Sequence, residues 1–154
     1  MGAGGSQNFE AAFFNKYATP EYYLSRGASG NVYGPIQWND MQLAIKQTMF
    51  AAGKVTEELK KDIETKKDIL SSIEHKHLMI IHFVDLSQLP KAMFIVMEFA
   101  AGGTLHGALK SLERSGAKLP IDMVTVWAKQ TAEGMLYLHQ KNIVHRDLKS
   151  SNSK

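Results

Sequence analysis

The sequence predicts an α+β fold, in which a run of strands interrupted by one helix is followed by helices. Three observations lead to this expectation. Short β-rich segments alternate with turn residues over 21–47 and again over 78–97. Apolar residues recur with a helical period over 55–73, and the pattern is helical again over 103–140. The chain has 154 residues, 44% of them hydrophobic, so it can bury a sizeable core.

The first part of the chain is expected to hold five strands and one helix. In the helix, an apolar stripe runs through Val55, Leu59, Ile63, Leu70 and Ile73. Glycine-rich residues 27–30 and the segment 38–40 are expected to be turns between the first three strands. The strands are expected at Tyr22–Leu24, Val32–Tyr33, Met41–Gln47, Leu78–Val84 and Ala92–Met97.

The second part is expected to be helical. A short helix is predicted from Gly103 to Leu112, and a longer one runs to about Gln140. Pro120 and Asp122 open the longer helix, with Asp122 as its cap or as an acid of its first turn.

Composition excludes several classes of function. The absence of Cys excludes disulfide scaffolds, thiolate metal sites and cysteine nucleophiles. No apolar run reaches the length of a membrane span. A net charge of +3 is too small to indicate a nucleic-acid partner. We therefore expect a cytoplasmic protein that binds no nucleic acid.

Residues 1–19 are expected to form a flexible N-terminal segment. Met1 to Ser6 fit the N-myristoylation pattern, with Gly2 next to the initiator Met. A single acyl chain gives only weak, reversible membrane attachment, and no basic cluster supports it, since the first lysine is Lys16. The alternative is a plain glycine-rich tail.

Two segments in the strand region have the residue types that bind phosphate. Ser25 to Val32 form a glycine-rich turn between two strands, where backbone N–H groups can approach a phosphate. The turn is neither a P-loop nor a Rossmann turn, because Gly-Lys-Ser/Thr is absent and a strand follows. Lys46 ends the buried run Leu43-Ala44-Ile45, and a buried lysine needs an anionic partner. A simple hairpin turn and an edge-strand lysine that reaches solvent remain the alternatives.

The most specific signal is the string from His145 to Asn152, on an expected loop after the long helix. Asp147 can accept a proton from a hydroxyl group. Lys149 can neutralise a phosphoryl group, and Asn152 can offer a carbonyl oxygen to a metal ion.

Together, in this order, these motifs resemble those of a eukaryotic protein kinase. Residues 97–105 resemble the hinge of that family, and residues 127–139 resemble the helix that precedes the catalytic loop. The details resemble the tyrosine-kinase-like serine/threonine group, in particular the mixed-lineage and other MAP kinase kinase kinases. The resemblance implies a partial protein kinase domain over 20–154, with an N-terminal lobe (antiparallel sheet plus one helix) at 20–97, a hinge at 98–103 and the start of a C-terminal lobe at 104–154.

The resemblance also implies the role of each residue. ATP and Mg²⁺ would be the cofactors, and a protein, such as a MAP kinase kinase, would be the substrate. Asp147 would orient the substrate hydroxyl and take its proton, Lys149 would steady the transferred phosphoryl group, and Asn152 would bind Mg²⁺. The nucleotide would be bound by the glycine-rich loop (Ser25, Arg26, Gly27, Ala28, Ser29, Gly30), by Val32 and Ala44 around the adenine, by Lys46 at the phosphates, by the gatekeeper Met97, and by the backbone of Glu98 and Ala100.

The sequence departs from the family pattern at three places. Ser25 replaces the first glycine of the loop. Lys66 occupies the helix position of the glutamate that should pair with Lys46, and the helical wheel places Lys66 on the stripe that faces the sheet. We expect this pair to be weakened, with Lys66 turned to solvent, unless the two sequences are misaligned.

The third departure is that residues 1–154 contain no Asp-Phe-Gly segment, so one of the two usual metal ligands is missing. The expectation is an incomplete chain with little or no turnover by itself. A truncated or pseudokinase-like module that binds without phosphotransfer, and a decoy that binds no nucleotide, are the alternatives. The oligomeric state is not indicated.

Overall fold

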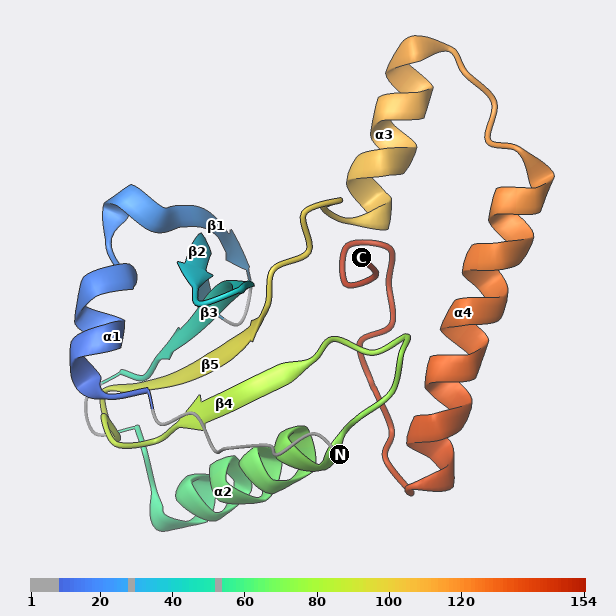
Figure 1. The fold of residues 1–154 in the computed structure, drawn as a ribbon. Helices are drawn as coiled ribbons and strands as arrows, with labels where there is room; N and C mark the ends of the chain where they lie inside the picture. The colour runs from blue at the N-terminus through green and yellow to red at the C-terminus, as the bar shows by residue number, and fades with distance from the viewer. Residues whose placement is uncertain (1–8, 28–29, 52–53) are drawn as a thin grey trace. The chain divides into compact units, whose positions relative to one another are not determined.

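The computed structural model describes residues 9–27, 30–51 and 54–154. The chain divides into two compact units (Figure 1). The N-terminal unit holds the chain up to Glu74 together with Met79–Phe99, and the C-terminal unit holds His75–Leu78 and Ala100–Lys154.

A five-stranded antiparallel sheet forms the centre of the N-terminal unit, in the order β1-β2-β3-β5-β4. Each expected strand is present, although β2 begins two residues earlier and extends to Trp38. Asn39, at the turn before β3, has a φ of 52°. The bounds are Tyr23–Gly27 (β1), Gly30–Trp38 (β2), Met41–Met49 (β3), Ile81–Asp85 (β4) and Ala92–Glu98 (β5).

The two faces of the sheet are covered by two different helices. Successive side chains of a strand point to opposite faces. On β5, Phe94 and Val96 join one hydrophobic cluster, whereas Met93 and Ile95 join another. The first cluster contains residues of α1 (Ala11–Tyr17), and the second contains Ile63 of α2 (Glu57–Ser72). Helices α1 and α2 therefore lie on opposite faces of the sheet (Figure 1).

Helix α1 corrects the expectation of a flexible segment over residues 1–19. The aromatic side chains of residues 9, 13, 14 and 17 are all buried, and Phe14 is only 1% exposed. Its ring stacks on that of Phe94 in β5, with 4.6 Å between the centroids. Aromatic residues at these spacings give a short helix one apolar side, and packing on the sheet stabilises a helix that is too short to be stable alone. Gly2 and the rest of residues 1–8 lie outside the described residues.

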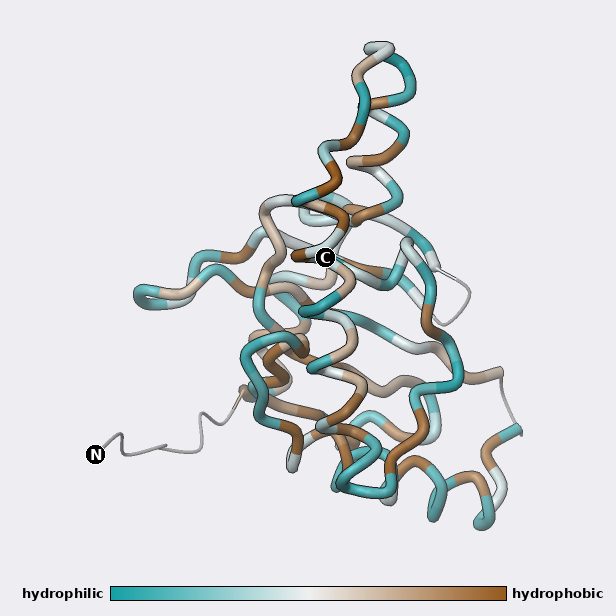
Figure 2. The backbone as a smooth tube through the Cα atoms, turned by 90° about the vertical axis from the view of Figure 1, so that its right-hand side faces the viewer, coloured by the Kyte–Doolittle hydropathy of each residue, from teal (hydrophilic) through white to brown (hydrophobic). Residues whose placement is uncertain are grey.

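Helix α2 has the expected apolar stripe, but Lys66 does not lie on it. Thr56 caps the helix by accepting a hydrogen bond from the Leu59 N–H, and Ile63 is buried against the sheet. Hydrophobic and hydrophilic residues alternate along the turns of the helix (Figure 2). Lys66 is exposed, and Lys67 on the other side of Ile63 is half-buried. Both positions lie about equally far from Ile63 around the helix, so the wheel alone could not separate them.

The C-terminal unit contains the two expected helices, α3 (Leu105–Ser115) and α4 (Ile121–Gln140), and ends in a loop. Asp122 is an acid in the first turn of α4, and Pro120 is the N-cap. Residues 75–78 pack on α4: the His75 ring stacks on Tyr137, and one Glu133 carboxylate oxygen lies 3.1 Å from both Lys76 Nζ and His77 Nε2. Within the described ranges, no helix is both long enough and apolar enough to cross a membrane.

Candidate functional site

Four of the expected nucleotide-binding residues share one face of the sheet in the N-terminal unit. The strand register places Val32 opposite Lys46, and Ala44 opposite Met97. Residues directly opposite each other on neighbouring strands point to the same face, as do residues two apart on one strand. Since Ala44 and Lys46 are two apart on β3, all four side chains lie together on the face that also carries α2.

This face combines an apolar surface with one cationic side chain. Ala44 and Met97 are buried, while Val32 and Lys46 are half-buried. Such a surface can hold a planar aromatic ring against Val32, Ala44 and Met97, and it carries the positive charge of Lys46 on the same face. The carbon chain of a lysine can lie along apolar surface while its charged end stays in a polar environment.

The glycine-rich turn is a hairpin between β1 and β2, with Gly27 opposite Gly30. Ser25, Arg26 and Gly27 are exposed, and the expected residues Ala28 and Ser29 lie outside the described residues. Gly30 has a φ of 137°, and a Cβ atom there would overlap the carbonyl oxygen of Gln47 on β3. Close packing against β3 is therefore a sufficient reason for this glycine.

The backbone at the expected hinge is partly engaged. The Glu98 N–H donates to the Ile80 carbonyl at 3.0 Å, and the Phe99 N–H donates to the Gln42 carbonyl at 2.9 Å. The Glu98 side chain accepts a hydrogen bond from the Ile80 N–H at 2.8 Å. Because the Glu98 N–H is already bonded, the Glu98 carbonyl is the backbone group of this residue that could accept a hydrogen bond from the edge of an adenine ring. Ala100 belongs to the C-terminal unit.

The loop at the end of the C-terminal unit brings Asp147, Lys149 and Asn152 together. The Lys149 ammonium lies 2.9 Å from one oxygen of the Asp147 carboxylate. The Asn152 side-chain amide donates to the other oxygen at 2.8 Å and to the Asp147 carbonyl at 2.9 Å. Arg146 adopts a left-handed conformation, with φ 62°, which is uncommon for a non-glycine residue and recurs at functional sites.

These contacts favour the ionised form of the Asp147 carboxylate. The hydrogen bond from Lys149 lowers the pKa of Asp147 below its ordinary value, and the hydrogen bond from Asn152 adds to this effect. Both partners of the ion pair are exposed, so the pair contributes little to stability. Its importance is that it fixes the carboxylate and places a positive charge beside it.

Backbone contacts that the sequence did not reveal hold the loop on α3. The N–H groups of Leu105 and His106 donate to the carbonyls of Ser153 and Ser150, at 2.8 and 3.0 Å. Thr104 caps the same helix end by accepting from Gly107 at 3.1 Å. The first N–H groups of a helix have no partner within the helix, so they are free to bind the loop. Contacts between backbone groups leave no residue-type signal, which is why the motifs did not predict them.

His145 supports the loop from its other end. Its Nδ1 atom accepts a hydrogen bond from the Asp147 N–H at 3.3 Å, and its ring is half-buried. Asn152 donates through its amide nitrogen, which leaves its carbonyl oxygen for a hard cation such as Mg²⁺. In the described part of the chain no group of three or more His, Asp or Glu side chains could hold a metal ion. Asn152 could contribute one oxygen ligand to such an ion.

Comparison with known proteins decides the family. The protein kinase domain matches residues 20–153. The chain belongs to the protein kinase family. This assignment confirms the resemblance found in the motifs and the α+β, kinase-like fold expected from them.

Relatives of known sequence include several kinases of the MAP kinase kinase kinase type. Mitogen-activated protein kinase kinase kinase 7 of Drosophila melanogaster is 36% identical over 118 residues, which are 75% of this chain and 16% of that protein. Mitogen-activated protein kinase kinase kinase 10 of Xenopus laevis is 34% identical over 129 residues, 82% of this chain and 12% of that protein. Cytokinesis protein sepH of Aspergillus terreus is 28% identical over 130 residues, 84% of this chain and 9% of that protein. The chain thus spans less than a fifth of the length of these relatives.

The expected site residues form two groups in this kinase chain. Val32, Ala44, Lys46 and Met97 meet on one face of the N-terminal unit, and Asp147, Lys149 and Asn152 meet in the loop of the C-terminal unit. The first group combines an apolar surface with a cation, and the second combines a carboxylate with a cation and an amide.

Proposed function

We propose that this chain is the nucleotide-binding and catalytic-loop part of a serine/threonine protein kinase of the MAP kinase kinase kinase type. Its reaction is transfer of the γ-phosphoryl group of Mg-ATP to a hydroxyl group of a protein. The observation that carries the proposal is the joining of Asp147, Lys149 and Asn152 in one hydrogen-bonded loop. A lysine two residues after the aspartate is typical of serine/threonine kinases and not of tyrosine kinases.

On this proposal the N-terminal unit binds the nucleotide. Val32, Ala44 and Met97 enclose the adenine ring, the Glu98 carbonyl and the Ala100 backbone bind its edge, and Lys46 binds the α- and β-phosphates. The glycine-rich hairpin, Ser25 to Gly30, covers the phosphates. The shared face of the four side chains, as fixed by the strand register, supports this assignment.

The loop residues position the acceptor and supply charge. Asp147 accepts a hydrogen bond from the substrate hydroxyl, orients it and takes its proton. Lys149 neutralises charge on the transferred group, and Asn152 offers its carbonyl oxygen to Mg²⁺. Bound Mg²⁺ supplies further charge neutralisation to the phosphates. Catalysis is then mostly positioning and electrostatic stabilisation.

A second candidate is a binding module without phosphotransfer. Lys66, at the position of the expected glutamate, is exposed, and residues 1–154 contain no Asp-Phe-Gly segment. The 154 residues alone are accordingly expected to bind nucleotide with little or no turnover. Nucleotide binding without phosphate transfer, even after an Asp-Phe-Gly segment and a full C-terminal lobe are added, would favour this second candidate.

Nucleotide binding tests the proposal directly. We expect ATP with Mg²⁺ to raise the unfolding temperature of the chain, because a ligand at 100 times its dissociation constant adds about 2.7 kcal/mol of stability. Lys46→Met should abolish most of the shift, and the matched surface change Lys61→Met should not. The absence of a shift at saturating ATP in the unmodified chain would contradict the proposal.

Three further assignments belong to the proposal. The substrate is a protein, and a MAP kinase kinase is the class suggested by the relatives' names. The chain acts in the cytoplasm. N-myristoylation at Gly2 gives at most a weak membrane contact, and labelled myristate that still appears on the Gly2→Ala variant would refute it.

A further inference from the structure

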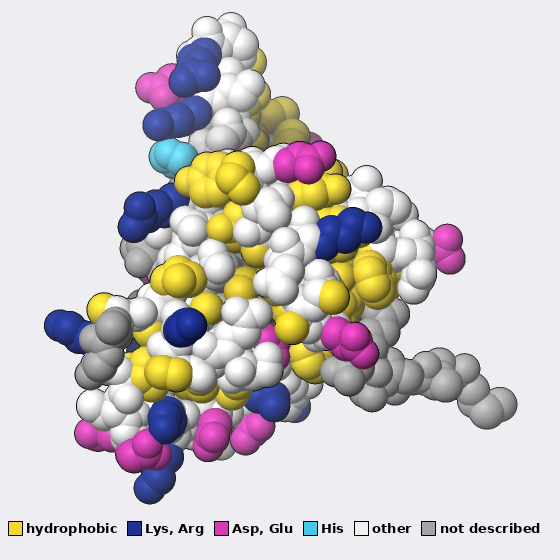
Figure 3. Space-filling view, turned by 90° about the vertical axis from the view of Figure 1, so that its left-hand side faces the viewer, with side chains coloured by type: hydrophobic (Ala, Val, Ile, Leu, Met, Phe, Trp, Pro, Cys, Tyr) yellow, Lys and Arg dark blue, Asp and Glu magenta, His cyan; other side chains and the backbone are white. Residues whose placement is uncertain are grey.

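Helix α1 lies outside residues 20–153, which match the kinase family, yet it forms part of the core of the N-terminal unit. Phe13 packs edge-on against Trp38 at the end of β2, with 4.8 Å between the ring centroids and 89° between the planes. Phe9 also contacts Trp38, at 5.5 Å. On the face that carries α1, hydrophobic side chains gather and charged side chains lie around them (Figure 3). The helix and the end of β2 thus form one continuous aromatic surface.

A groove of about 310 Å³ runs along this surface. Ala12 is exposed and has only a methyl group, so the wall of the groove is low at that position. Trp38 is half-buried and stands on the other side. The volume is at the lower end of the range for ligand-binding sites. A groove of this size can hold one large side chain of a ligand together with the residues that flank it. The lining residues are Phe9, Glu10, Ala12, Phe13, Lys16, Tyr17 and Trp38.

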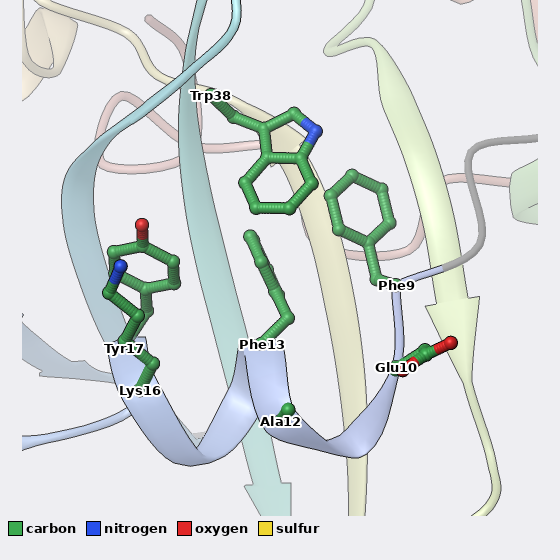
Figure 4. A pocket seen from close by; sticks show the side chains of 7 residues that line it. All are labelled: Phe9, Glu10, Ala12, Phe13, Lys16, Tyr17 and Trp38. Carbon is green, nitrogen blue, oxygen red and sulfur yellow. The ribbon is translucent and has the colours of Figure 1, made fainter.

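The two ends of the groove carry opposite charges. Glu10 and Lys16 lie on opposite sides of Phe13 (Figure 4). They are six positions apart in the sequence, or about 9 Å along a helix. Glu10 makes no side-chain hydrogen bond or ion pair with the residues that the structure describes, and the Lys16 ammonium lies over the Tyr17 ring at 4.9 Å. Both charges are exposed at the surface and can therefore meet a ligand.

This charge pattern selects among ligand classes. A nucleic acid or an anionic membrane would be repelled by Glu10, and a ligand with a single charge would satisfy only one end. A peptide carries charges of both signs at short spacing, and about three residues of extended chain span roughly 10 Å. Aromatic walls that take an inserted side chain are typical of the centres of protein–protein contacts.

We propose that the groove between α1 and Trp38 is a docking site for a short peptide segment of a partner protein. The segment places one aromatic or branched aliphatic side chain against Phe13 and Trp38, a basic residue at Glu10 and an acidic residue at Lys16. This site does not depend on nucleotide binding, so it stands or falls separately from the proposed kinase function.

Dye-labelled tetrapeptide pools test the proposal by fluorescence anisotropy with the full chain. One set has Arg first and Glu fourth, and the other has Glu first and Arg fourth. The two central positions hold Phe, Trp or Leu next to a varied residue. We expect saturable binding of one set in preference to the other. Failure of every pool to bind up to millimolar concentration would overturn the proposal.

Two pairs of variants locate the binding. Ala12→Tyr fills the groove and should weaken binding at least about tenfold, whereas Ala11→Tyr, on the same turn but not in the lining, should leave it unchanged. The exchange of both charges, Glu10→Lys with Lys16→Glu, should reverse the preference between the two peptide sets. Equal effects of the two tyrosine variants, or an unchanged preference after the charge exchange, would contradict the site.

Discussion

At position 30 only a hydrogen atom fits as a side chain. The φ of Gly30 is 137°, and a Cβ atom would overlap the Gln47 carbonyl oxygen. We expect Gly30→Ala to destabilise the chain by about 2–4 kcal/mol, through strain and displacement of β3. Gly102→Ala is the control, because a Cβ there has no heavy atom within 4 Å, and it should cost less than about 1 kcal/mol. Urea unfolding measures the unfolding free energy of both variants. Equal losses of stability would show that the chain relieves the overlap at position 30 without cost.

The carboxylate of Asp147 should respond to the loss of its cationic neighbour. Lys149→Met removes the hydrogen bond that lowers the pKa of Asp147 most, so the pKa should rise toward the ordinary value of about 3.9. Because the folded-state pKa is depressed, the interaction favours the folded state above the ordinary pKa and is lost as the pH falls through the folded value. Its small contribution to stability is therefore present above a pH of about 4 and disappears as the pH falls below that value. Carbon NMR titration of the Asp147 carboxyl measures the shift, and an unchanged pKa would refute this account of the loop.

Lys66 provides a residue-scale test of the weakened pair. Its exposed side chain agrees with an orientation toward solvent, although not with the face assigned from the helical wheel. If this position corresponds to the family's glutamate, the carboxylate of Lys66→Glu turns from solvent toward the sheet, attracts Lys46 and increases ATP affinity. Lys60→Glu, elsewhere on the same helix, is the control. If Lys66→Glu leaves ATP affinity unchanged, the alignment of this position with the family's glutamate is wrong.

At the scale of elements, α1 should act as a structural part of the N-terminal unit. Phe14→Ala removes the ring that stacks on Phe94, and we expect a loss of about 3–5 kcal/mol in unfolding free energy. Asn15→Ala changes the exposed side of the same helix and should change stability by less than about 0.5 kcal/mol. Thermal unfolding at equal concentration compares them. A small effect of Phe14→Ala would mean that α1 is only loosely attached.

The expected strands and helices could be predicted because their signals are local. Short β-rich segments between turn residues predicted β1 to β5. The recurrence of Leu59, Ile63 and Leu70 at helical spacing predicted α2. The sequence did not predict α1 because the helix has only seven residues and follows a glycine-rich start. The ring that packs on Phe14 belongs to Phe94, eighty residues later. A contact at that distance has no local pattern. The catalytic loop motif was predictable by residue type, but the backbone bonds that fix it to α3 were not.

At the scale of the whole molecule, helix α4 exposes a large apolar surface. Ile121 is 74% exposed, Val126 50% and Leu136 58%. A helix that is apolar over several sides normally has neighbours on those sides. We expect the 154-residue chain to self-associate in solution. The double variant Ile121→Lys with Leu136→Glu should reduce light scattering, and Lys129→Glu, on a polar side, should not.

A soluble monomer of the unmodified chain, with a single cooperative unfolding transition at the same concentration, would contradict this prediction. Equal scattering by the two variants would show that the surface responsible for association lies elsewhere.

The central claim is that the Lys46 ammonium binds the phosphates of a nucleotide. An ATP analogue with a reactive acyl group on its terminal phosphate transfers that group to lysines held beside the phosphates, and mass spectrometry of the peptides then identifies them. The account predicts that Lys46 is the principal lysine modified in the N-terminal unit and that excess ATP protects it, while exposed lysines of α2 react weakly and without protection. Labelling spread evenly over the surface lysines, or labelling of Lys46 that ATP does not reduce, would contradict it.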